Sequence, residues 1–73
     1  MKLHEFWILV GMQRAQHSSE RLGQIAFNIL EENRPEMANA IRGSDMDPFY
    51  VSDAMTSFDK RMDRFVTWLS ENW

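Results

Sequence analysis

Residues 33–50 read NRPEMANAIRGSDMDPFY, and they decide how the helices of this chain meet. Both prolines of the chain lie in this stretch, together with one of its three glycines. Pro35 suits the first position of a helix, where its missing N–H is not needed. Gly43 is typical of the residue that ends a helix, and Asp47 before Pro48 repeats the pattern of a cap followed by a proline. The stretch therefore predicts a short helix from Pro35 to Arg42 and a helical turn over 47–51.

Two longer helices are predicted before this stretch, over residues 3–15 and about 20–32. In the first, the run Phe6–Val10 is apolar in every direction around the helix axis. A helix of that kind is buried in a core or at a subunit interface. Gly11 costs about 1 kcal/mol inside a helix, so it either lets another backbone come close or marks a weak point.

The second helix has a start signal, a close-packing signal and an end signal. Ser18 or Ser19 can serve as the N-cap, because a hydroxyl accepts from a free amide of the first turn. Gly23 removes a side chain from the face that carries Phe27, so we expect another element to pack closely there. Asn33 tolerates the left-handed conformation in which many helices end.

Residues 53–72 predict the last helix, which has a narrow apolar seam at alternating spacings of three and four. The seam consists of Met55, Phe58, Met62, Phe65 and Leu69. We expect this seam to pack against the first two helices. The sequence has no second alternating run that could pair with a strand, so residues 1–73 predict a single all-α domain. Its architecture is a small bundle of three longer helices, one short helix and a helical turn.

Length and composition exclude several classes of protein. Seventy-three residues make one domain at most. The absence of cysteine fits a reducing compartment, and no signal peptide or apolar run long enough for a membrane span is present. The net charge of −3 gives nucleic acid little overall attraction.

The residues that carry most catalytic and metal chemistry are sparse. The spacing of Asp45 and Asp47 resembles a calcium loop, but the sixth position is Tyr50 and the twelfth is Thr56, where such a loop needs Gly and Glu. His17 and Glu20 supply two ligands, whereas a metal site needs three or four. We expect no enzyme, no cofactor and no metal site.

Aromatic and arginine side chains are the candidate contacts with a partner. The sequence has nine aromatic residues, more than a core of this size easily hides. The candidate partner or self-association surface consists of Trp7, Ile8, Trp68 and Trp73, and the candidate polar and aromatic contacts are Arg34, Arg42, Phe49 and Tyr50. For Phe49 and Tyr50 we favour a role in closing the end of the core over a role as an exposed anchor.

Two functional hypotheses follow from these residues. The first is a non-enzymatic protein that acts by protein–protein interaction and forms a homodimer through its first helix or the face of Trp68. The second is a nucleic-acid-binding regulator in which a helix-turn-helix-like arrangement presents Arg34 and Arg42.

The chain also resembles small uncharacterised proteins encoded by bacteriophages, notably those that infect actinobacteria. The resemblance covers about residues 21–73 and rests on the following positions: Arg21-Leu22-Gly23-Gln24, Phe27-Asn28, Arg34-Pro35, Ala38, Ile41-Arg42-Gly43, Asp47-Pro48-Phe49-Tyr50, Phe65, Trp68 and Trp73. The resemblance implies a phage protein made in the cytoplasm of a host bacterium, which binds a host or phage protein. It implies no catalytic residues.

Overall fold

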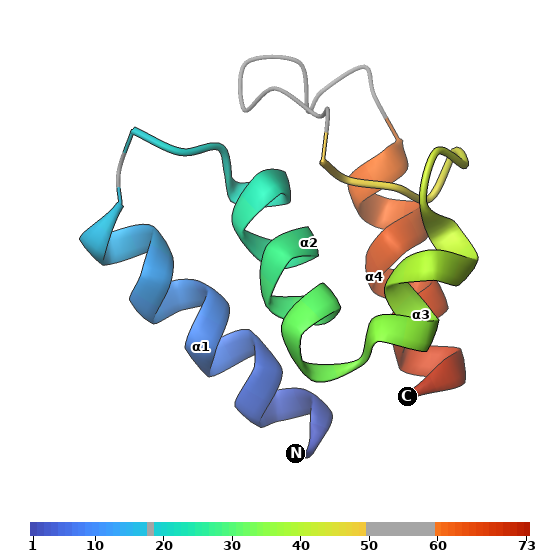
Figure 1. The fold of residues 1–73 in the computed structure, drawn as a ribbon, viewed down its shortest axis with the longest axis horizontal. Helices are drawn as coiled ribbons and strands as arrows, with labels where there is room; N and C mark the ends of the chain where they lie inside the picture. The colour runs from blue at the N-terminus through green and yellow to red at the C-terminus, as the bar shows by residue number, and fades with distance from the viewer. Residues whose placement is uncertain (18, 50–59) are drawn as a thin grey trace.

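The computed structural model describes residues 1–17, 19–49 and 60–73, and within these ranges the chain forms four α-helices and no strand. They are α1 (Leu3–Gln16), α2 (Leu22–Asn33), α3 (Pro35–Ile41) and α4 (Arg61–Asn72). The helices run alternately up and down, and both ends of the chain lie at the same end of the molecule (Figure 1). The predicted all-α bundle of three longer helices and one short helix is confirmed.

The joint between α2 and α3 is a single residue. Arg34 has φ −141° and ψ 69°, outside the helical region, and Pro35 follows it at the first position of α3. At the other end of α3, Gly43 has φ 75°, the left-handed conformation that favours glycine. Both predictions are confirmed. The expectation for Asn33 was wrong: it stays in α2, and its Nδ2 donates a hydrogen bond to the carbonyl oxygen of Ile29 at 2.8 Å.

The start of α2 also differs from the prediction. The helix begins at Leu22 with Arg21 as its N-cap, and no side chain caps it. Ser18 lies outside the described residues, and Ser19 is in the turn before the helix. In this turn the amide of Glu20 donates to the carbonyl oxygen of His17 at 3.0 Å. Because α1 and α2 run in opposite directions, the chain uses these residues to reverse.

The last helix begins at Arg61, later than the predicted start at Asp53. Lys60 precedes it with φ −90° and ψ 6°, in the bridge region of backbone conformation. Residues 53–59, with two members of the predicted seam, lie outside the described residues. The rest of the seam behaves as expected, because Phe65 and Leu69 are fully buried and Met62 packs against the core.

The packing of α4 against α1 is aromatic. The rings of Trp7 and Phe65 lie 6.1 Å apart in a T-shaped arrangement, and those of Phe6 and Trp73 lie 5.3 Å apart. All four helices contribute to one core, whose buried members are Phe6, Val10, Ile25, Ala26, Phe27, Ile29, Leu30, Ala38, Ile41, Phe65 and Leu69. The expected contact of the seam with the first helix is confirmed, and its contact with the second helix stays a prediction.

The segment after α3 packs onto α2 at Gly23. A Cβ atom at this position would overlap the backbone carbonyl of Pro48. Next to this contact, the rings of Phe27 and Phe49 meet edge to face at 5.9 Å. The expectation that another element packs closely at Gly23 is confirmed. Asp47 and Pro48 are not helical, Phe49 lies in a turn, and the last two residues of the predicted helical turn, Tyr50 and Val51, lie outside the described residues.

The dimensions of the molecule show how little core it has. Its radius of gyration is 11.4 Å, close to the value of about 11 Å expected for a folded chain of this length. The principal extents are 29 × 27 × 17 Å, so the thinnest direction holds only two layers of helices, each about 10 Å across. Within the described ranges, no helix is both long and apolar enough to span a membrane.

Candidate protein-binding surfaces

One side of α1 is exposed and uncharged. Ile8 and Met12 are 58% and 53% exposed, and Gly11 and Ala15 are also exposed. These four residues share one side of the helix because their spacings are three, four and seven. We refer to them as the α1 face. Among the described residues, no atom outside the backbone of α1 itself lies within 4 Å of the place where a Cβ of Gly11 would be, so close packing against another described element does not account for this glycine.

Two of the predicted surface tryptophans pack within the chain. Trp7 meets Phe6 at 4.9 Å and Phe65 at 6.1 Å, both edge to face. Trp73 packs on Phe6, and its Nε1 donates to the carbonyl oxygen of Met1 at 3.2 Å. Both rings are partly buried against the core. The four predicted residues therefore do not form one surface: Ile8 is on the α1 face, and Trp68 lies elsewhere.

Arg34 connects the two ends of the chain to the joint between α2 and α3. Its Nη2 donates to the carbonyl oxygen of Met1 at 2.9 Å. Its guanidinium carbon lies 4.8 Å from the centre of the Trp73 ring, within the range of a cation–π interaction. These contacts explain Arg34 as an intramolecular residue.

Arg42 and Phe49 both contact the ring of Phe27. The guanidinium carbon of Arg42 lies 5.1 Å from the ring centre, and its Nη2 pairs with Oε1 of Glu31 at 2.9 Å. Phe49 is partly buried and packs on the core, as we favoured from the sequence. Tyr50 lies outside the described residues. Of the four predicted polar and aromatic contacts, the three described ones thus have partners within the chain.

Asp47 organises the segment that connects α3 to Phe49. Its side chain is only 3% exposed. One carboxylate oxygen accepts from the amide of Gly43 at 2.8 Å, and the other accepts from the amide of Phe49 at 2.9 Å. The second bond forms an Asx-turn. Turn formation, expected from the sequence, therefore accounts for Asp47, whereas no helix that it could cap begins at Pro48.

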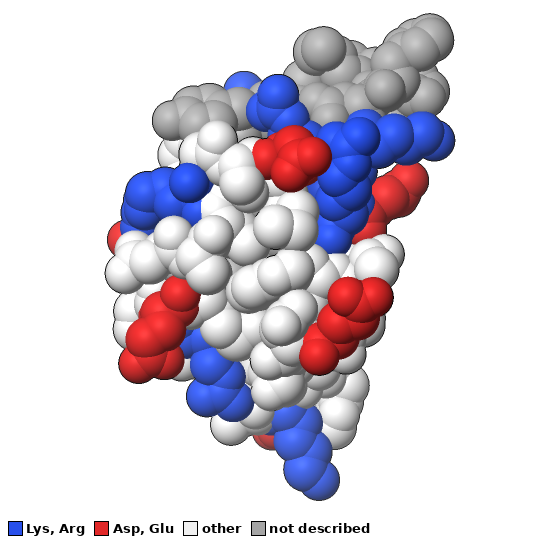
Figure 2. All heavy atoms as spheres, turned by 90° about the vertical axis from the view of Figure 1, so that its right-hand side faces the viewer, with Lys and Arg blue, Asp and Glu red and all other residues white. Residues whose placement is uncertain are grey.

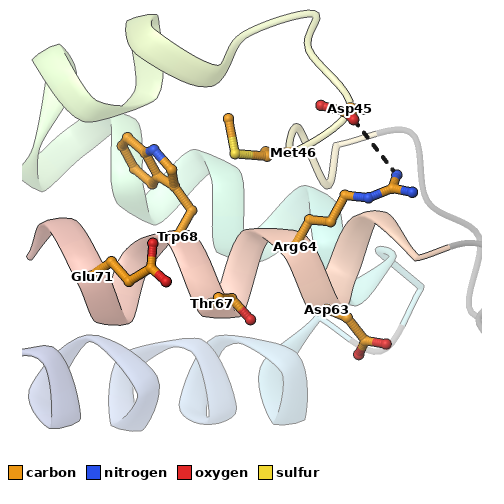
Figure 3. Close-up of a pocket in the computed structure, with 7 residues that line it drawn as sticks. All are labelled: Asp45, Met46, Asp63, Arg64, Thr67, Trp68 and Glu71. Atoms are coloured by element: carbon orange, nitrogen blue, oxygen red, sulfur yellow. Dashed lines mark ion pairs between the residues drawn. The ribbon is translucent and has the colours of Figure 1, made fainter.

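A groove of about 380 Å³ lies between α4 and the loop that follows α3. Figure 3 shows Trp68 and Met46 lying together between these two elements. Asp45 belongs to the same loop, and its carboxylate lies 3.9 Å from the guanidinium of Arg64. We call this the α4 groove, and it is lined by Asp45, Met46, Asp63, Arg64, Thr67, Trp68 and Glu71.

The charges around the α4 groove are mainly negative. Three carboxylates line it against one guanidinium, and that guanidinium already faces Asp45. On the side of the molecule seen in Figure 2, uncharged atoms fill the middle, acidic groups lie on both sides of them, and Lys and Arg groups lie above and below. Trp68 is the one groove residue that we had selected from the sequence.

The sequence pattern indicates one wall of this groove, the side of α4, but not the other. Asp63, Thr67 and Glu71 are four residues apart, so they share one side of α4. Arg64 and Trp68 follow the same spacing one position later. The other wall, Asp45 and Met46, belongs to a loop without periodicity, so no pattern places it opposite α4.

The described residues show no arrangement suited to metal binding. Within residues 1–17, 19–49 and 60–73, no group of three or more His, Cys, Asp or Glu could hold a metal ion. His17 and Glu20 line a small hollow between α1 and α2 together with Glu32.

Comparisons with protein-family models, with curated proteins and with solved structures found no match for this chain.

Proposed function

We propose that the protein acts by binding other proteins, and that a second copy of the chain binds at the α1 face. The observation that carries this proposal is the exposure of Ile8 and Met12 on either side of Gly11, with no other element of the described chain packed at the glycine. Exposed apolar residues scattered singly are common. Here two of them adjoin two small residues on one side of one helix.

A second copy suits this face because the face carries no charge. Two identical surfaces that meet about a two-fold axis bring each residue close to its own counterpart. A charged face would then suffer like-charge repulsion, whereas the α1 face can meet itself without this cost. Gly11 and Ala15 also allow two helix axes to approach closely, since the interaxial distance depends on the side chains at the contact.

The expected affinity is modest. A stable interface buries about 800 Å² on each partner, and four side chains, two of them small, cover less than that. We therefore expect association in the micromolar range or weaker.

The resemblance to actinobacteriophage proteins extends the proposal: the chain would be phage-encoded and would meet its partners in the cytoplasm of a bacterial host.

Nucleic-acid binding receives less support. The two arginines on which that hypothesis rests make contacts within the chain, Arg34 with Met1 and Trp73, and Arg42 with Glu31 and Phe27. The intervening helix, α3, is only seven residues long. We therefore do not propose it as the function.

The test is the mass of the protein as a function of concentration, measured by sedimentation equilibrium. We expect the wild-type mass to rise from 8.7 kDa towards that of a dimer as the concentration increases. Met12→Glu should stay monomeric, because a buried unpaired carboxylate at a two-fold interface faces its own copy.

Val66→Glu is the matched control. Val66 is 40% exposed on α4, so the change adds the same charge to another exposed apolar position, and this variant should dimerise like the wild type. A wild-type protein that stays at 8.7 kDa at millimolar concentration contradicts the proposal. Equal losses in Met12→Glu and Val66→Glu contradict the assignment to the α1 face.

A further inference from the structure

The α4 groove differs from the α1 face in both shape and charge. The α1 face is an uncharged side of one helix. The groove has an apolar floor, formed by Met46 and Trp68, and three carboxylates among its lining residues. The two share no residue, since the α1 face belongs to α1 and the groove is lined by α4 and the loop after α3.

We infer that the α4 groove binds a short segment of another protein that presents a lysine or arginine beside an apolar side chain. The charge of the groove selects such a segment. Asp45 already has a positively charged partner, because the guanidinium of Arg64 lies 3.9 Å from its carboxylate. Asp63 and Glu71 are therefore the two carboxylates that can attract an incoming cation. An acidic segment would meet these carboxylates without compensation.

The apolar floor of the groove supplies contacts for both the cation and the apolar side chain of the bound segment. The ring of Trp68 is partly buried against the core and lines the groove. A cation over the face of a tryptophan is attracted by the ring quadrupole. Met46 lies beside it (Figure 3), and a flexible thioether adapts to apolar side chains of different shapes. A volume of about 380 Å³ lies at the lower end of ligand-site sizes, so it holds a few side chains rather than a whole helix.

The experiment uses two synthetic hexapeptides and amide NMR spectra of the full chain. One peptide alternates lysine with leucine, and the other alternates glutamate with leucine. We expect the lysine peptide to shift the indole N–H resonance of Trp68 and the amides of Met46 and Thr67. The amides of Ile8 and Met12 should not move. The affinity should fall as salt is added, since exposed charges are screened over about 10 Å at 0.1 M and about 3 Å at 1 M.

Two double variants separate the groove from the overall charge. Asp63→Asn with Glu71→Gln removes both groove carboxylates and should weaken binding of the lysine peptide roughly 3- to 10-fold. The control pair, Glu36→Gln with Glu32→Gln, removes the same charge elsewhere. Each pair takes one carboxylate from the first turn of a helix and one from near the end of a helix, so their effects on folding are comparable.

A third variant tests the floor. Trp68→Leu keeps an apolar side chain but removes the aromatic face, and we expect roughly 2- to 5-fold weaker binding of the lysine peptide. The dispersion of the remaining amide resonances shows whether the variant is folded.

Four outcomes would overturn the inference. One is equal binding of the two hexapeptides, and another is an equal loss in the two double variants. A third is a set of shifts confined to α1. The last is a shift of the groove resonances when the protein concentration is raised without any peptide, which would assign the groove to a second copy of the chain.

Discussion

Two helical glycines of this chain have opposite surroundings. Gly23 is buried, and a Cβ there would overlap the backbone carbonyl of Pro48. Gly11 is exposed, and a Cβ there would meet no described atom within 4 Å apart from the backbone of its own helix. The same substitution at the two positions therefore separates the cost of a steric clash from the intrinsic cost of glycine in a helix.

Gly23→Ala should lower the free energy of unfolding by about 1–3 kcal/mol, because the backbone of Pro48 cannot rotate away as a side chain can. Gly11→Ala should raise it by about 0.5–1 kcal/mol, since alanine restricts the unfolded chain. Urea unfolding at a concentration where the protein is monomeric measures both. Stabilisation by Gly23→Ala would show that the segment after α3 does not pack on α2 in this way.

At the residue scale, the sequence predicts the roles of residues that are set by local backbone conformation. It misses the roles that are set by contacts with residues distant in the sequence. Pro35, Gly43 and Gly23 were assigned correctly because their local conformation or missing side chain determines their use. Arg34 looked like a contact for a ligand, because its actual partner, the carbonyl oxygen of Met1, lies 33 residues away in the sequence. No local pattern predicts such a contact.

At the scale of elements, the segment after α3 depends on one carboxylate. Asp47 is buried and accepts from the amides of Gly43 and Phe49. It thereby connects the end of α3 to the residue that packs on Phe27. Asp45, two positions earlier, is a natural comparison because its side chain is 73% exposed.

Asp47→Ala should lower the free energy of unfolding by about 1–3 kcal/mol, because two backbone amides lose their acceptor. Asp45→Ala should change it by less than about 0.5 kcal/mol, as is usual for exposed positions. Thermal unfolding followed by circular dichroism compares the two. If both variants unfold at the wild-type temperature, the hydrogen bonds of Asp47 contribute nothing net to stability.

The existence of the helices was predictable, and two of their starting points were not. Apolar spacing indicated each helix, and proline and glycine indicated the ends of α3. The serines near residue 19 suggested an N-cap, but the reversal between α1 and α2 uses that turn, so α2 starts at Leu22. The α4 groove was not predicted, because one of its walls is a loop.

At the scale of the whole molecule, α4 completes the core. Phe65 is fully buried and meets Trp7 of α1, whereas Trp68 of the same helix is only partly buried. A chain of this length has a total stability of about 4–10 kcal/mol. A single large cavity in such a thin core is therefore comparable to the whole free energy of folding.

Phe65→Ala should cost about 3–5 kcal/mol and leave much of the protein unfolded at room temperature. Trp68→Ala should cost about 1–2 kcal/mol, because a partly buried ring removes less apolar surface from water. Circular dichroism at increasing urea concentration ranks the two variants. Equal losses would place Trp68 in the core and remove it from the floor of the groove.

The indole N–H of Trp73 donates a hydrogen bond to the carbonyl oxygen of Met1, so the side chain of residue 73 reaches the backbone of residue 1. A short peptide linker between these two residues would span a gap that the Trp73 side chain already bridges, so head-to-tail cyclisation should strain the fold little. The circular chain would have less conformational freedom when unfolded. For the same reason, a bulky fusion partner at either end would displace a contact that also involves Arg34.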